Sequence, residues 1–140
     1  MISKVYGVIP KQLQKKEIAH TGLTQLLIVA DMHERKAAIA DMADAFVALP
    51  GGIGTLEEIF EAWTWAQLGY HLKPCAFYNV DGFYNELLAM IDKMVDKGFL
   101  KTDYAKRLIK ADSPGDLIAQ INAYQPPSEK WENNFTLGEV

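Results

Sequence analysis

Apolar residues gather along the chain in four short runs, and each run is apolar at nearly every position rather than at alternate ones. This pattern is typical of strands that are buried on both faces of a sheet. Proline ends the first run, and a Pro-Gly-Gly turn ends the third, as expected where a strand stops. We therefore predict four strands, at Val5–Pro10, Gln25–Ala30, Ala45–Leu49 and Cys75–Asn79.

The segments between these runs have helical spacing. Apolar residues recur at intervals of three and four over 55–68, which predicts an amphipathic helix that Gly69 is placed to end. Further helices are predicted at 34–43, 83–97 and 103–109, and another begins at Ser113-Pro114, where serine is a good N-cap and proline a good first residue. The polar segment Lys11–Thr21 is predicted to be a loop.

Buried strands that alternate with helices indicate a parallel sheet with helices on both faces, so the fold class is α/β. The length of 140 residues corresponds to one domain. We place this domain at residues 1–125, and we interpret the polar segment 126–140 as a tail.

Composition narrows the class of partner. Eighteen acidic residues against fourteen basic ones give a net charge of −4, which argues against a nucleic-acid partner. The apolar runs are too short to cross a membrane, which argues against a membrane partner, and the N-terminus lacks a signal-peptide pattern. A single cysteine, Cys75, excludes an internal disulfide and a cysteine-based zinc cage and favours the cytoplasm. We expect Cys75 to be a buried thiol, and the three histidines lack the spacing of metal ligands.

The segment Pro50–Glu58 carries the clearest chemistry. A strand runs into a glycine-rich turn, which runs into the start of a helix. Such a turn presents backbone N–H groups and the positive end of a helix dipole, and glycines let an anion approach the backbone closely. The sequence is neither a Walker A motif nor GxGxxG, so the turn predicts an anionic ligand, such as a phosphate, without specifying it further.

Two charged positions near this segment have both a structural and a functional interpretation. Thr55 and Glu58 have the spacing of a capping box, with Thr55 as N-cap and Glu58 three residues later, and local evidence favours this structural role. A glutamate there would also lie near a sugar attached to the bound phosphate. Arg35 and Lys36 are either a solvated helix start or functional cations, since positive charge is disfavoured at a helix N-terminus.

Two motifs, Met32–Lys36 and Pro50–Glu58, resemble those of the LONELY GUY (LOG) family, whose members carry M-x-x-R-K and P-G-G-x-G-T-x-x-E. The likeness covers about residues 5–124 and includes Trp65–Gly69 and Asn79–Tyr84. Members of this family are cytokinin riboside 5′-monophosphate phosphoribohydrolases, and many bacterial members were once labelled lysine decarboxylases. That label implies pyridoxal phosphate held by a lysine, for which the sequence offers no convincing candidate.

The resemblance implies a Rossmann-like fold, a homodimer, and hydrolysis of the N-glycosidic bond of a nucleoside 5′-monophosphate to free base and ribose 5-phosphate. No metal and no organic cofactor is implied. Carried over by motif position, Arg35 and Glu58 are the catalytic pair. The expected substrate contacts are Glu17, Lys36, Gly51, Gly52, Gly54, Thr55 and Glu57. Glycoside cleavage passes through an oxocarbenium-like sugar, which a carboxylate can stabilise while an arginine positions that carboxylate or neutralises the departing base.

Family members have about two βα units before the segment that matches Val5–Pro10, so we expect an N-terminally shortened form of the fold. An alternative to the active hydrolase is a catalytically weak nucleotide-binding or oligomerising remnant of the same fold, with Trp65 and Tyr70 at an interface. The sequence leaves open whether the preferred base is adenine or a prenylated adenine.

Overall fold

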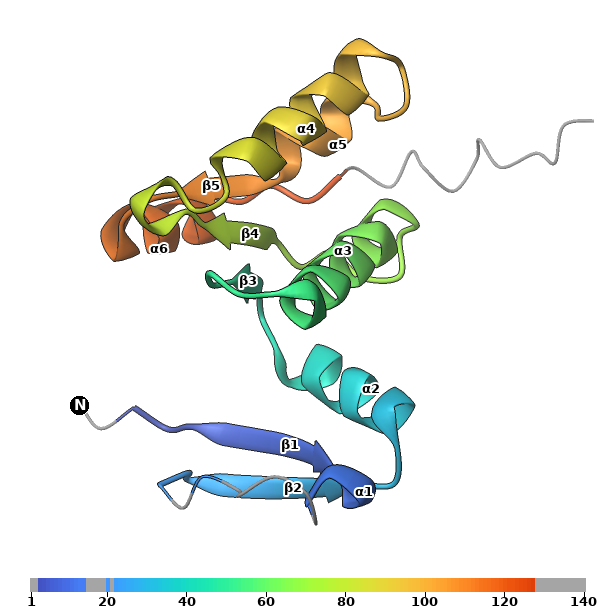
Figure 1. Cartoon of the computed structure of the whole chain (residues 1–140), viewed down its shortest axis with the longest axis vertical. Coiled ribbons are helices and arrows are strands. Elements are labelled where there is room, and N and C mark those ends of the chain that lie inside the picture. Colours follow the sequence, from blue (N-terminus) through green and yellow to red (C-terminus); the bar gives the residue numbers. More distant parts are fainter. Residues whose placement is uncertain (1–2, 15–19, 21, 128–140) are drawn as a thin grey trace, which may run out of the picture. The chain divides into compact units, whose positions relative to one another are not determined.

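A computed structural model describes residues 3–14, 20 and 22–127 of the chain. These residues cluster into two compact units, one up to Ala43 and the other from Asp44 onwards. Figure 1 labels the helices and strands of both units. Glu17 and most of the expected tail lie outside the described residues.

The first unit is a parallel strand pair with two helices. Strands β1 (Tyr6–Pro10) and β2 (Gln25–Val29) pair so that Tyr6 lies opposite Gln25 and Pro10 opposite Val29. Helix α2 (Met32–Met42) packs against β1. The short helix α1 (Lys11–Gln14) stands where a loop was predicted, because its lysine, glutamine and leucine residues favour helix and it packs against β1.

The second unit contains a three-stranded parallel sheet in the order β3 (Phe46–Ala48), β4 (Cys75–Tyr78), β5 (Ile109–Ala111). Figure 1 shows β4 between its two neighbours. Helix α3 (Ile53–Gln67) connects β3 to β4. After β4 come the 3-10 turn η1 (Val80–Gly82) and the helices α4 (Asn85–Asp96), α5 (Thr102–Arg107) and α6 (Pro114–Asn122).

Alternate residues of β4 face two separate apolar clusters. Cys75 and Phe77 join the larger one, which also contains Ala48, Ile59, Ala62, Trp63, Tyr84, Ile91 and Leu108. Ala76, between them in sequence, joins the smaller one with Ile109, Ala111 and Leu117. Because α3 and α4 contribute to the first cluster and α6 to the second, helices cover both faces of this sheet. The predicted α/β class, with parallel strands and flanking helices of the Rossmann-like type, is confirmed.

One strand was missed by the pattern of apolar residues. The predicted helix over 103–109 ends at Arg107, and Ile109 instead begins β5, where it pairs with Ala76. The apolar Leu108-Ile109 pair fits a helix end and a short strand equally well, and only pairing with β4 decides between them.

Helix ends follow the predicted chemistry more closely. Gly69 has a positive φ of 79° after α3, and the N–H groups of Gly69 and Tyr70 bond back to the carbonyls of Ala66 and Trp65, as in a Schellman motif. Ser113 caps α6, with its hydroxyl accepting from the N–H of Asp116. No helix in the described part of the chain is long and apolar enough to cross a membrane.

Candidate functional site

The glycine-rich turn leads directly from β3 into α3. Gly52 is the N-cap of the helix, with an extended backbone, and its carbonyl accepts the N–H of Leu56 at 3.1 Å. Thr55 therefore lies inside the first turn, and the predicted capping box with Thr55 as N-cap is wrong. The helix begins two residues earlier because Gly52 supplies the extended residue, and Ile53 to Thr55 already lie in the helix.

The three glycines of this turn have different surroundings. A Cβ on Gly51 would collide with the Thr55 hydroxyl and lie 3.0 Å from the Thr55 Cβ, so the threonine side chain covers this glycine. Apart from the adjacent residues and the backbone of the helix itself, no heavy atom lies within 4 Å of the position that a Cβ would take on Gly52 or Gly54. The protein itself thus fills the space beside Gly51, whereas the surface over Gly52 and Gly54 is open to an approaching group.

Glu57 and Glu58 follow on the solvent-exposed side of α3. The opposite side of the helix packs into the core through Ile59, Ala62 and Trp63. Trp63 is buried, and Trp65 is half-buried. Because α3 begins at Ile53, both carboxylates lie in the second turn of this helix.

Arg35 is held by the strand next to its helix. Its Nε donates to the carbonyl of Val8 in β1 at 3.0 Å, and its side chain is partly buried. The acidic residues before it start the helix: Asp31 accepts from the N–H of Glu34 at 2.9 Å, and Glu34 accepts from the N–H of Ala30 at 2.7 Å. This reciprocal pair is a capping arrangement, so the negative charge in the segment serves the helix start.

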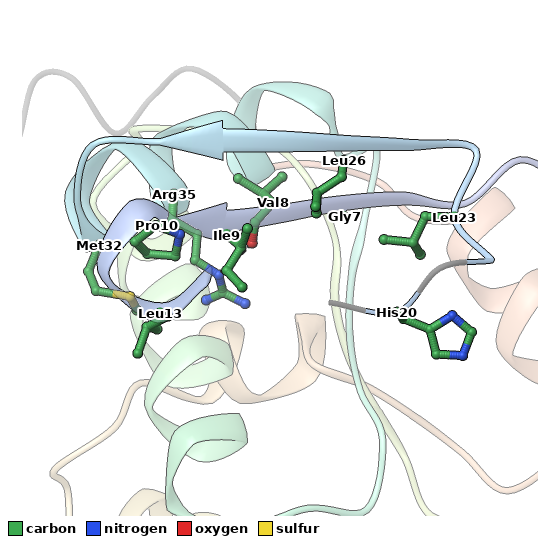
Figure 2. A pocket seen from close by; sticks show the side chains of 10 residues that line it. All are labelled: Gly7, Val8, Ile9, Pro10, Leu13, His20, Leu23, Leu26, Met32 and Arg35. Carbon is green, nitrogen blue, oxygen red and sulfur yellow. Dashed lines mark hydrogen bonds between the residues drawn. The ribbon is translucent and has the colours of Figure 1, made fainter. Parts of the chain in front are cut away.

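A pocket of about 350 Å³ lies beside Arg35 in the first unit. Figure 2 shows Met32, Pro10 and Leu13 at one end, and His20 and Leu23 at the other. Most of its lining is apolar, and the guanidinium of Arg35 adds one positive charge. Such a lining suits a planar or apolar group that carries a hydrogen-bond acceptor.

The predicted site residues fall into three groups. Gly51, Gly52, Gly54 and Thr55 meet at one strand-to-helix junction, with Glu57 and Glu58 on the same helix. Arg35 and Lys36 lie next to each other in α2, in the first unit. Glu17 lies outside the described residues.

Tyr84 contacts the residue just before the glycine-rich turn, and no specific signal in the sequence predicts this contact. Its hydroxyl donates to the carbonyl of Leu49 at 2.6 Å, just before Pro50. Burial raises the pKa of Tyr84, so the hydroxyl stays protonated and remains a donor. The segment Asn79–Tyr84 drew attention only through its likeness to family sequences, because a bond across 35 residues has no local signature.

Two further side chains that bear reactive groups have structural surroundings. Cys75 is 3% exposed, which confirms the predicted buried thiol, and burial raises its pKa to about 12. His71 joins its Nε2 to the carbonyl of Ala62 at 2.7 Å, while its Nδ1 accepts from the N–H of Lys73 at 3.0 Å. Within the described ranges, no group of three or more His, Cys, Asp or Glu side chains is placed to hold a metal ion.

Comparison with known proteins agrees with this arrangement of motifs. Residues 2–121 match the family described as "Possible lysine decarboxylase". The chain is 47% identical over 136 residues to a cytokinin riboside 5′-monophosphate phosphoribohydrolase of Arabidopsis thaliana, covering 97% of this chain and 63% of that protein. A second Arabidopsis protein of that name is 49% identical over 89% of this chain and 58% of its own length.

A probable enzyme of the same name from Oryza sativa subsp. japonica is 48% identical over 90% of this chain and 52% of its own length.

The fold and the turn define an α/β protein with a glycine-rich loop at a helix start. The extent of the match shows the particular family: this chain belongs to the LOG family. It spans between 52% and 63% of the length of these three relatives.

Proposed function

We propose that this chain hydrolyses the N-glycosidic bond of a nucleoside 5′-monophosphate, either AMP or a cytokinin nucleotide, to free base and ribose 5-phosphate. The observation that carries the proposal is the identity of 47–49% to named phosphoribohydrolases over most of this chain, with both family motifs inside the match. In the reaction the bond between C1′ and the base nitrogen breaks, a water oxygen bonds to C1′, and the base leaves with a proton.

The glycine-rich turn suits the phosphate of such a substrate. The surface over Gly52 and Gly54 is open, and the first N–H groups of α3 point out of the helix start. A phosphate held there would supply binding energy remote from the reacting bond and fix the sugar relative to α3. We assign Gly51, Gly52, Gly54 and Thr55 to this task, with Glu57, Lys36 and Glu17 as further contacts.

We assign the chemistry to Glu58 and Arg35. The carboxylate of Glu58 stabilises the positive charge that develops on the sugar, as carboxylates do in glycoside hydrolysis. Arg35 is a fixed cation because its Nε is bonded to the Val8 carbonyl, and it orients the carboxylate or neutralises negative charge on the departing base. No metal and no organic cofactor is needed for either role.

We also propose that the working form is a homodimer in the cytoplasm. Tyr70 and Leu68 at the end of α3 are exposed apolar side chains, at 76% and 55%, which fit a contact between subunits. Light scattering coupled to size-exclusion chromatography tests the oligomer, and a mass of a single chain would contradict it.

Base release from AMP and from isopentenyladenosine 5′-monophosphate, measured by chromatography, tests the activity. We expect Glu58→Gln to lower release at least about 100-fold, because general catalysis by a positioned carboxylate contributes on this scale. Glu86→Gln is the matched control, since Glu86 is also an exposed carboxylate near a helix start but belongs to α4.

The outcomes separate the two hypotheses. Release that disappears only in Glu58→Gln supports the hydrolase, and the faster of the two substrates identifies the preferred base. Nucleotide binding without any release supports the nucleotide-binding remnant instead. Equal loss in both variants would contradict the assignment of Glu58.

A further inference from the structure

We propose that Tyr84 is a positioning residue that holds the glycine-rich turn in its anion-binding form. This proposal rests on the nucleotide site proposed above. The segment Asn79–Asn85 fixes this tyrosine, and its hydroxyl fixes the last carbonyl before the turn. The wider family likeness covers Asn79–Tyr84, but this segment lies outside the two motifs Met32–Lys36 and Pro50–Glu58.

The bond from Tyr84 to the turn is short and protected. The hydroxyl donates to the Leu49 carbonyl at 2.6 Å, and the tyrosine is 2% exposed. Its ring packs edge-on against the rings of Phe77 in β4 and Phe83, with ring centroids 4.8 Å and 4.9 Å apart. Because these two ring contacts restrict the Tyr84 side chain, its hydrogen bond restrains the Leu49 carbonyl and the turn that follows.

The backbone around Tyr84 is also fixed. The side-chain oxygen of Asn79 accepts the N–H of Tyr84 at 2.7 Å, and its amide nitrogen donates to Asn85 at 2.8 Å. The backbone N–H of Asn79 bonds to the carbonyl of Ala111 in β5 at 2.7 Å. The tyrosine is thereby connected to the central sheet by hydrogen bonds that do not involve the turn.

Between these bonds the chain reverses through two left-handed residues. Asp81 has φ of 50° and Gly82 has φ of 71°. A Cβ on Gly82 would lie 2.6 Å from the amide nitrogen of Asn85, so this turn closes tightly on the asparagine. This reversal returns the chain from β4 and brings Tyr84 within hydrogen-bond distance of Leu49, the residue after β3.

The Leu49 carbonyl is the point at which this support reaches the proposed site. Leu49 follows β3 directly, and Pro50, Gly51 and Gly52 separate it from the first residue of α3. Pro50 fixes its own φ and restricts the preceding residue Leu49, whereas the two glycines that follow leave the backbone free. Fixing the carbonyl before them limits where the N–H groups of the first helical turn can lie.

Tyr84→Phe tests the proposal, because it removes only the hydroxyl. In hydrogen–deuterium exchange of the full 140-residue chain, we expect peptides that cover 49–55 to exchange about two- to tenfold faster, the scale of one lost hydrogen bond. Tyr124→Phe is the matched control, since Tyr124 packs against the smaller core cluster rather than the turn. Unchanged exchange at 49–55 in Tyr84→Phe, or the same change in Tyr124→Phe, would overturn the proposal.

A second readout ties the support to the phosphate. We expect the ratio of kcat/KM for AMP to that for adenosine to fall about two- to tenfold in Tyr84→Phe, because only AMP carries the group that the turn binds. Loss of folded protein would lower both values equally and leave the ratio unchanged. An unchanged ratio would overturn the positioning role of Tyr84. If the unsubstituted chain releases no base at all, the proposed function is contradicted instead. In that case the hydrogen–deuterium exchange experiment still decides whether Tyr84 holds the turn.

Discussion

Cys75 illustrates at the scale of one residue how position sets chemistry. The thiol lies at the start of the central strand, 3% exposed, and burial raises its pKa to about 12. A thiolate is the reactive form of cysteine, and here it is suppressed throughout the physiological range. The same burial makes Cys75 a reporter of folding.

The shifted pKa of Cys75 predicts a loss of stability at high pH. The unfolded chain releases this proton above its ordinary pKa of 9.0, while the folded chain keeps it up to about 12. The free energy of unfolding therefore falls as pH rises through that window, by at most about 1.4 kcal/mol per pH unit. Urea unfolding of the unsubstituted chain and of Cys75→Ala at a series of pH values measures the difference.

Other groups also titrate at high pH, so the effect of Cys75 is measured by comparing the unsubstituted chain with Cys75→Ala. Burial raises the pKa of Tyr84, Tyr104 and Tyr124 in the same direction. These tyrosines are present in both proteins, and Cys75→Ala should lose stability less steeply. Parallel pH profiles would contradict the assigned pKa of Cys75.

At the scale of an element, the strand-to-helix junction depends on glycine for two separate reasons. Gly51 lacks a side chain because Thr55 occupies the space. Gly54 has open space at the same position, so the fold itself does not require a glycine there. Substitution by alanine at the two positions should therefore have opposite effects on stability.

We expect Gly51→Ala to lower the free energy of unfolding by about 1–3 kcal/mol, because the added methyl group collides with Thr55. Gly54→Ala should raise it by up to about 1 kcal/mol, since alanine favours helix over glycine. The second variant should nevertheless bind AMP about tenfold or more weakly if the phosphate approaches this surface. Urea unfolding and calorimetric titration with AMP measure the two effects, and unchanged AMP affinity in Gly54→Ala would contradict the phosphate position.

How much of these elements the sequence predicts depends on how local their causes are. The strands β1 to β4 and the end of α3 at Gly69 follow from apolar runs and a single glycine. The start of α3 was misplaced, because Thr55 and Glu58 have the spacing of a capping box while the backbone of Gly52 starts the helix. Strand β5 needs its partner β4 to be recognised.

The residues of the candidate site likewise differ in whether their causes are local. The glycine-rich turn indicates an anion from local physics alone, whereas the assignment of Arg35 and Glu58 rests on likeness to a family. The bond from Arg35 to Val8 and the bond from Tyr84 to Leu49 span 27 and 35 residues. No periodicity or composition encodes contacts at such separations.

At the scale of the whole molecule, buried side chains are unevenly distributed between the two units. Both apolar clusters belong to the second unit, and its strand β4 contains Ala76 and Phe77 at 0% exposure. Among the described residues up to Ala43, Pro10 is the one that falls in the buried class. Local stability should follow this difference, because opening a well-packed strand exposes more apolar surface.

We expect the amides of β4 to exchange most slowly with deuterium, and those of β1 and β2 to exchange at least about tenfold faster. Mass spectrometry of peptides from the intact chain after a series of exchange times measures both. The expected order follows from burial, since both strand pairs are parallel and differ little in hydrogen-bond pattern. Equal protection in the two units would contradict it.

The start of α3, with Gly52 as its N-cap, has a consequence for how binding at this turn would respond to pH. Backbone N–H groups do not ionise, unlike lysine or histidine side chains, so their ability to donate is constant across the pH range in which proteins stay folded. If backbone N–H groups hold an anion, the anion is the only group in that contact whose protonation changes with pH. The pH dependence of affinity contributed by the turn would then follow the second ionisation of the phosphate itself, near pH 6, and would be a property of the ligand rather than of the protein.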